Sequence, residues 1–158
     1  MTSPGPLTIE PHPIITYRPR QVTRRIIIHD SHTTVAPTAD LATYLRVLGR
    51  TRGLLEVGYH YVVERDGTYS RTRPHTTIGS HAPGHNHDSI GICLGVSPGD
   101  PSELTTGQKI SLRFIITGLL FYYGHQVAIK GHWEVQKFKG RPPCPSFDMD
   151  AIRKLVAE

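Results

Sequence analysis

The run Ile26-Ile27-Ile28 constrains the fold more than any other segment of this 158-residue chain. Successive side chains of a strand point to opposite faces of a sheet, so three consecutive β-branched apolar residues need cover on both faces. The run therefore predicts a central buried strand, which ends at His29. A chain of this length is suited to one domain with a single core.

Helical patterns that follow this strand in the chain can cover its two faces. Residues 38–51 carry apolar side chains at helical spacing, with Thr38 as the expected N-cap and Gly53 as the stop. Thr105 and Gln108 form a capping box for a longer helix. This second helix is expected to reach about Tyr123 and to end at Gly124, and a third over 148–156 is expected to be capped by Ser146.

Further strands alternate with these helices. The Asp66-Gly67 pair predicts a hairpin. The expected strands are 57–64, 68–71, 89–96 and 127–129, with loops over 73–88 and 131–145. Strands interspersed with helices predict an α/β domain over 24–158, with a central mixed sheet flanked by about three helices. Residues 1–23 hold five prolines and no clear period, which predicts an extended arm.

Charge and cysteine content exclude some classes of protein. Two cysteines permit at most one disulfide, so this is no disulfide scaffold. The net charge of +5 attracts polyanions, but the basic residues are scattered and no basic-aromatic motif indicates nucleic acid as a partner. No run approaches the ~18 apolar residues of a membrane span. The first residues do not resemble a signal peptide, so we expect a monomeric protein that is cytoplasmic when synthesised.

Three positions suggest a metal site. His29 ends a buried strand, His132 follows a short strand, and Cys144 lies in a Pro-Pro-Cys-Pro segment. A zinc hydrolase uses three protein ligands and one open position for water. From the residues alone, a hydrogen-bonded structural histidine and a buried thiol remain alternatives, because no HExxH or CxxC pair is present. Cys93, between Ile92 and Leu94 on a strand, is interpreted as a buried thiol.

A series of motifs carries a family resemblance. The chain contains Val-Gly-Tyr-His-Tyr-Val-Val-Glu-Arg-Asp-Gly-Thr from Val57, then Ile-Gly-Ser-His-Ala, then Gly-His-Asn-His-Asp-Ser-Ile-Gly-Ile-Cys-Leu. It closes with Gly-His-Trp-Glu-Val and Cys-Pro-Ser-Phe-Asp. In this order the motifs resemble the type 2 amidases, which include the T7-type phage lysozymes and the peptidoglycan recognition proteins. The resemblance extends from about Arg24 to Leu155 and implies their α/β fold.

The resemblance also implies a reaction. Members of that family are zinc-dependent N-acetylmuramoyl-L-alanine amidases, which cut the amide bond between the sugar and the peptide stem of bacterial peptidoglycan. By residue-for-residue matching, His29, His132 and Cys144 would bind one Zn²⁺ per chain. Tyr59 matches the catalytic tyrosine, which would orient the attacking water or stabilise the oxyanion. A phage or prophage endolysin that lyses the host cell is the expected role.

One departure from the T7-type pattern concerns a catalytic lysine. Those enzymes have a lysine two residues before the ligand cysteine, where this chain has Pro142. Arg141, Lys139 and Lys137 are the possible substitutes, and Arg141 is favoured because it is nearest in sequence.

The roles of several other residues are less clearly indicated by the sequence. His81 and Asn86 are candidate substrate-binding residues of the 73–88 loop, and His32 is expected to be an ordinary loop histidine. Trp133 would either line the sugar groove or pack under the metal loop. His60 is expected to face away from Tyr59 on a shared strand and to be structural.

Two rival functions remain open. A recognition module would bind peptidoglycan without cutting it, and only the missing lysine favours this. A nucleic-acid-binding or polymerase-binding protein is compatible with the charge alone.

Overall fold

Five strands form one mixed sheet in the order β3-β2-β4-β1-β5. The computed structural model describes residues 3–7, 10–12, 14–31, 40–96, 103–137 and 143–158. The strands are β1 (Arg25–Asp30), β2 (Tyr61–Val63), β3 (Tyr69–Arg71), β4 (Ser89–Leu94) and β5 (Ala128–Gly131). β1 pairs in parallel with β4 and β5, β2 pairs in parallel with β4, and β3 is the antiparallel edge. The predicted central strand is confirmed, since Ile26, Ile27 and Ile28 are all buried.

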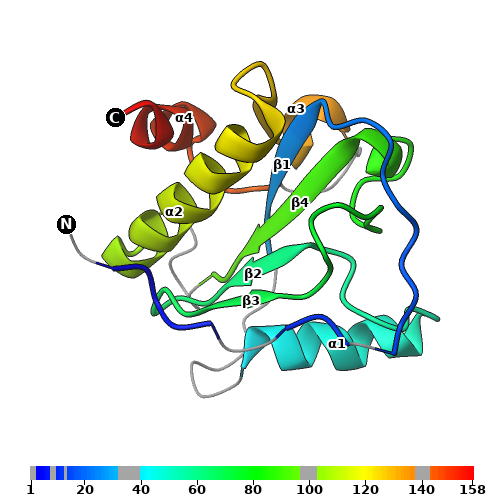
Figure 1. Cartoon of the computed structure of the whole chain (residues 1–158). Coiled ribbons are helices and arrows are strands. Elements are labelled where there is room, and N and C mark those ends of the chain that lie inside the picture. The colour runs from blue at the N-terminus through cyan, green and yellow to red at the C-terminus, as the bar shows by residue number, and fades with distance from the viewer. Residues whose placement is uncertain (1–2, 8–9, 13, 32–39, 97–102, 138–142) are drawn as a thin grey trace.

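Helices cover both faces of this sheet (Figure 1). α2 (Thr106–Tyr123) and α4 (Met149–Ala157) pack on the face that presents Ile26 and Ile28. α1 (Leu41–Thr51) packs with Val62 and Cys93 on the opposite face. The predicted α/β class with a mixed sheet is therefore confirmed. A fourth helix, the single-turn α3 (His132–Val135), follows β5.

The long helix matches its prediction closely. Thr105 accepts a hydrogen bond from the backbone of Gln108, whose side chain accepts one from the backbone of Thr105, and Gly124 ends the helix. The predicted apolar stripe is buried against the sheet: Leu112, Ile115, Ile116, Leu119 and Leu120.

Two predicted caps are wrong. The N-cap of α1 is Asp40, which accepts a hydrogen bond from the backbone of Ala42, and Thr38 lies outside the described residues. The N-cap of α4 is Asp148 rather than Ser146. The carboxylate of Asp148 accepts from the backbone N–H of Asp150 at 3.0 Å, whereas Ser146 lies two residues earlier and donates its backbone N–H to the carboxylate of Asp30.

The predicted strand over 57–64 is mostly not a strand. Only Tyr61–Val63 is extended in the sheet, and residues 58–60 form bends. The chain passes close to Ser80 here, and only glycine fits at position 58, since a Cβ there would lie 2.0 Å from the backbone oxygen of Ser80. The hairpin prediction is confirmed, with Gly67 at φ +91° between β2 and β3.

The sequence predicts a loop over residues 131–145, but the structure has the helix α3 within this segment. The carboxylate of Glu134 accepts a hydrogen bond from the backbone of Gly131 and pairs with Arg153 of α4 at 2.8 Å. This contact between distant segments fixes the turn, and it is not visible in the local sequence.

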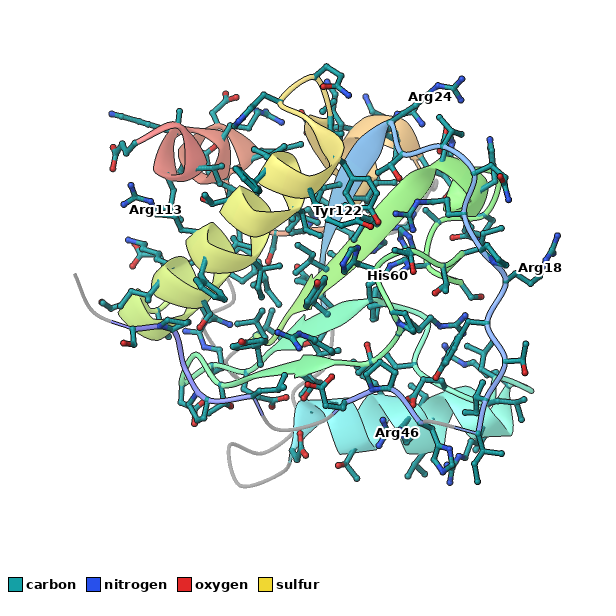
Figure 2. All side chains as sticks on the ribbon, viewed as in Figure 1. Arg18, Arg24, Arg46, His60, Arg113 and Tyr122 are labelled. Atoms are coloured by element: carbon teal, nitrogen blue, oxygen red, sulfur yellow. The ribbon has the colours of Figure 1, made fainter. Side chains whose placement is uncertain are left out.

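The described residues before β1 lie extended on the surface. Leu7 forms a bridge with Tyr69 of β3, and Pro19 forms one with Thr77. Figure 2 shows Arg18, Arg24 and Arg113 pointing outward from separate parts of the molecule, so the labelled basic side chains form no single patch. Within the described part of the chain, none of the helices combines the length and the apolarity that a bilayer crossing demands.

Candidate functional site

Two of the predicted metal ligands lie at one edge of the sheet because of its topology. His29 belongs to β1, and His132 directly follows β5. The two strands are parallel neighbours, with Ile28 opposite Gly131, so both histidines lie at the carboxyl ends of their strands. Open α/β sheets commonly bind ligands at this edge.

Cys144 completes the group from a distant segment. Its Sγ lies 3.8 Å from Nδ1 of His29, and one ligand atom from each of the three residues lies within 4.8 Å of the others. The backbone N–H of Trp133 donates to the carbonyl of Cys144 at 2.6 Å, which ties this segment to α3.

Asp30 also holds the cysteine segment in place, a role that no sequence motif indicated. This carboxylate is buried and accepts the N–H of Ser146. Its position directly after His29 was the available signal.

The imidazole of His132 is oriented by Gln136, a residue that no sequence motif indicated. Nε2 of His132 lies 3.0 Å from Oε1 of Gln136, and the amide nitrogen of Gln136 donates to the carbonyl of Pro83. The amide oxygen of Gln136 is therefore the acceptor, and Nε2 of His132 carries the proton. This leaves Nδ1 as the nitrogen that can act as a metal ligand. The four-residue spacing is a helical signal that would have required α3 to be predicted.

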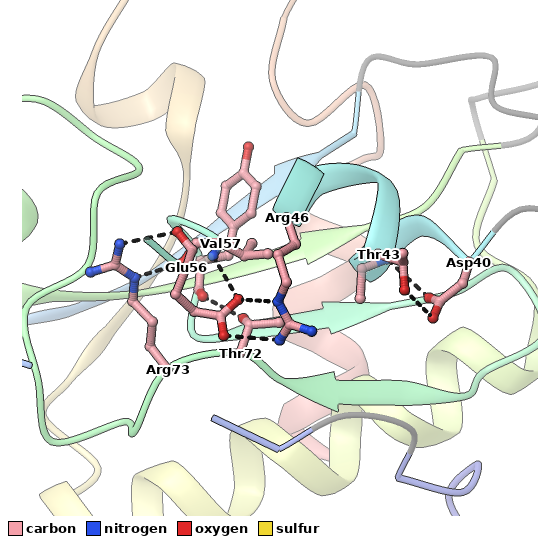
Figure 3. Close-up of polar contacts among 9 residues, drawn as sticks. Asp40, Thr43, Arg46, Glu56, Val57, Thr72 and Arg73 are labelled. Carbon is pink, nitrogen blue, oxygen red and sulfur yellow. Dashed lines mark hydrogen bonds and ion pairs between the residues drawn. The ribbon is translucent and has the colours of Figure 1, made fainter. Parts of the chain in front are cut away.

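A polar network fixes the backbone that leads into Tyr59 (Figure 3). Arg46 of α1 forms two hydrogen bonds with the buried carboxylate of Glu56, at 2.7 and 2.9 Å. Arg73 donates to the carbonyl of Val57 at 2.6 Å. Bidentate pairs of this kind set geometry as well as charge. The segment that carries Tyr59 is thus held from α1 on one side and from the β3 end on the other.

Tyr59 lies beside the ligand cluster. Its ring centroid is 4.9 Å from that of His29. Burial, the nearby thiol of Cys93 and the thiol of Cys144 raise the pKa of Tyr59 well above its ordinary value. Tyr59 also packs against the cluster that contains the fully buried Cys93. Tyr59 is consequently a neutral phenol at neutral pH, able to donate a hydrogen bond but not to act as a base.

His81 contacts the side of the His29 ring that faces away from Cys144. Its Nδ1 is 2.9 Å from Nε2 of His29, and its Nε2 is 3.3 Å from Oγ of Ser89. Burial, together with His29 and further histidines nearby, lowers the pKa of His81 well below its ordinary value. Asn86 Oδ1 accepts hydrogen bonds from the backbone N–H groups of His81 and Ala82, at 2.9 and 2.8 Å.

His60 is fully buried, and both of its ring nitrogens contact the backbone. One ring nitrogen accepts from the backbone of Gly91 at 3.0 Å, and the other donates to the carbonyl of Thr77 at 2.7 Å. Burial lowers the pKa of His60 to about 3. These contacts support the expected structural role of His60, although neither His60 nor Tyr59 belongs to a strand.

A cleft of about 940 Å³ opens over the cluster. The candidate residues Tyr59, His81, Asn86 and Trp133 all line it, and Leu45 and Leu48 of α1 form another part of its wall. The volume is within the range of small-ligand sites. Lys137 is exposed beyond α3, whereas Arg141, Lys139 and His32 lie outside the described residues.

The donor set suits zinc. Zn–S bonds of ~2.3 Å and Zn–N bonds of ~2.0–2.1 Å place tetrahedral ligands about 3.5 Å apart. The 3.8 Å between Sγ of Cys144 and Nδ1 of His29 is close to that spacing, and two imidazoles with one thiolate are typical zinc ligands.

Comparison with known proteins identifies the family. The family model described as N-acetylmuramoyl-L-alanine amidase matches residues 18–147. The chain belongs to this amidase family. The endolysins of Enterobacteria phage T3 and Escherichia phage T7 are each 34% identical to it over 139 residues, which cover 85% of this chain and 88% of theirs.

Solved structures share its architecture. N-acetylmuramoyl-L-alanine amidase LysC from Clostridium intestinale superposes with a TM-score of 0.71 at 25% identity, covering 96% of this chain and 97% of LysC. Drosophila PGRP-LB gives 0.67 at 26% identity, covering 82% and 79%. These matches support amidase activity, and the cluster of His29, His132 and Cys144 could hold a metal ion in this amidase.

Proposed function

We propose that this amidase uses one Zn²⁺ ion, held by His29, His132 and Cys144, to hydrolyse the bond between N-acetylmuramic acid and L-alanine in bacterial peptidoglycan. The observation that carries the proposal is the convergence of these three donor groups beside the cleft. The family model and the endolysin relatives support the class of substrate.

The chain's own residues would divide the work of amide hydrolysis. When bound, the ion supplies a water of lowered pKa and polarises the substrate carbonyl. Tyr59 would donate its phenolic proton in a hydrogen bond to the oxygen that gains charge, because its raised pKa keeps it protonated. Arg141, chosen from its position in the sequence, would supply the positive charge that T7-type enzymes obtain from lysine.

The cleft residues would orient the glycan and its peptide stem. Trp133 and Asn86 line the cleft and are proposed to contact the substrate. Trp133 would offer an aromatic face for a sugar ring, and Asn86 would offer a polar amide group. His81 is a separate case because its ring nitrogens contact His29 and Ser89.

The biological role that follows is lysis of a bacterial cell from inside. The phage T3 and T7 relatives are both named endolysins, which supports this role. An enzyme made in the cytoplasm would reach the wall once the membrane is permeabilised. A recognition module that binds peptidoglycan without cutting it is the competing function.

Product analysis on purified cell walls tests the proposal. We expect about one zinc per chain by elemental analysis, clearing of wall suspensions, and free stem peptides that begin with L-alanine by mass spectrometry. Cys144→Ser should lose both zinc and activity, and His87→Ala, a change in an exposed histidine, should lose neither.

Two other results would contradict it. Products with cut sugars would indicate a glycosidase instead. Wall binding by zinc-loaded protein with no released product would indicate the recognition module.

A further inference from the structure

A continuous chain of hydrogen bonds extends from the proposed ligand His29 into the protein interior. Nδ1 of His29 faces Cys144, and Nε2 on the opposite side of the ring lies 2.9 Å from Nδ1 of His81. Nε2 of His81 lies 3.3 Å from Oγ of Ser89. The hydroxyl of Ser89 in turn donates to the backbone carbonyl of His85 at 2.7 Å.

The two ends of this chain together fix the direction of every bond in it. A carbonyl can only accept, so Ser89 uses its single proton on His85 and must accept from Nε2–H of His81. At the other end, Nδ1 of His29 faces Cys144 and must be unprotonated to act as a ligand, so the proton of His29 is on Nε2 and Nδ1 of His81 is its acceptor. Nε2 of His29 then donates to His81, and the lone pair of His29 Nδ1 is directed at the cluster.

The sheet is shaped to admit the ring of His81 at this position. Gly91 of β4 lies two residues before Cys93, which is the partner of His29 in the β1–β4 pairing. A Cβ on Gly91 would approach the ring of His81 to 2.6 Å, so only glycine leaves room for it. Asn86 fixes the backbone of His81 through two further hydrogen bonds.

We propose that His81 is a positioning residue that sets the tautomer and orientation of the ligand His29, with Ser89 fixing His81 in turn. Ligand histidines generally donate their second N–H to a carboxylate, a carbonyl or water, and loss of that partner typically costs 10–100-fold in metal affinity or activity. Here a second imidazole takes that place. The inference rests on the proposed function, because it requires the ion at His29.

Zinc affinity, measured by competition with a chelator, tests the inference directly. His81→Phe keeps a ring of similar shape but removes both nitrogens, and it should weaken zinc binding by roughly 10–100-fold. His81→Gln keeps an acceptor for His29 and a donor for Ser89, and it should restore most of the affinity. The visible spectrum of the Co²⁺-substituted protein should change in His81→Phe and return toward wild type in His81→Gln.

Matched variants separate positioning from general damage. His87→Phe alters an exposed histidine near the same segment and should leave affinity and spectrum unchanged. Ser89→Ala removes only the second link, so it should weaken zinc binding less than His81→Phe does, and it provides the test if His81→Phe fails to fold. The unfolding transition of each metal-free protein shows whether the fold itself has been damaged.

Three results would overturn the inference. Unchanged zinc affinity and cobalt spectrum with a raised KM would make His81 a substrate contact. Losses in His81→Gln equal to those in His81→Phe would show that the hydrogen bonds do not matter. Wild-type protein that binds no zinc would remove the proposed function as well, whereas tight binding by wild type and variants alike would overturn only the role of His81.

Discussion

Tyr59 combines a buried phenol with a position beside the proposed ligand His29. Tyr59→Phe removes the hydroxyl and little else. If the hydroxyl stabilises the oxyanion, kcat should fall by roughly 10²–10³-fold, as for other single oxyanion donors. Zinc content should stay at the wild-type value, because Tyr59 is not a ligand.

Kinetics on cell-wall substrate, with zinc measured in the same samples, checks this expectation. Tyr44→Phe is the matched control, since Tyr44 also lines the cleft and lies on α1. Loss of zinc along with activity in Tyr59→Phe would show a structural role, and unchanged kcat would exclude the phenol from the reaction.

At the scale of single residues, the sequence motifs identified the cluster but not its internal geometry. His29, His132 and Cys144 were matched from the motifs, and the structure brings their ligand atoms within 4.8 Å. Which ring nitrogen faces the cluster depends on Gln136 and His81. Those contacts join segments far apart in the chain or depend on an unpredicted helix, so no local pattern reveals them.

At the scale of elements, the hydrophobic patterns predicted more than the capping residues did. Burial decides where β1 and α2 lie, and apolar periodicity reports burial directly. Capping depends on which side-chain acceptors reach the N–H groups of the first helical turn, and these acceptors can come from distant segments. The α1 N-terminus shows this well, because Asp40 and the carboxylate of Glu64 both accept from its first N–H groups.

Glu64 makes the stability of α1 docking depend on pH. Partial burial raises the pKa of Glu64 to about 7, against 4.5 ordinarily. Between these values the folded protein holds a proton that the unfolded chain has released, so the contribution of Glu64 to stability falls as pH rises from about 4.5 through 7. Above pH 7 the folded state carries a partly desolvated charge.

Glu64→Gln should abolish this part of the pH dependence. The free energy of unfolding of the variant, minus that of wild type, should be more positive at pH 8 than at pH 5. Urea unfolding of both metal-free proteins at the two pH values measures the difference, with Glu103→Gln as a control for losing one exposed carboxylate. A difference that is the same at both pH values would show that Glu64 titrates alike in the folded and unfolded chains.

At the scale of the whole molecule, the proposed ion would connect three separate parts of the chain. Its ligands come from β1, from α3 and from the segment before α4, and 115 positions separate His29 from Cys144. An ion that binds only the folded chain stabilises it by about 4 kcal/mol at 1,000 times the dissociation constant. For a domain of this size each kcal/mol raises Tm by roughly 2–4 °C.

Metal removal should therefore lower the thermal stability of the entire domain rather than of one loop. Zinc-loaded protein should unfold roughly 10 °C above protein stripped with a chelator, and in one transition, because the ligands belong to both the central strand and the periphery of the same core. Calorimetry with and without zinc measures the shift. Cys144→Ser should lose most of it, and Mg²⁺, which prefers oxygen ligands, should produce none. An equal zinc shift in Cys144→Ser would place the stabilising ion elsewhere and would contradict a site built from these three side chains.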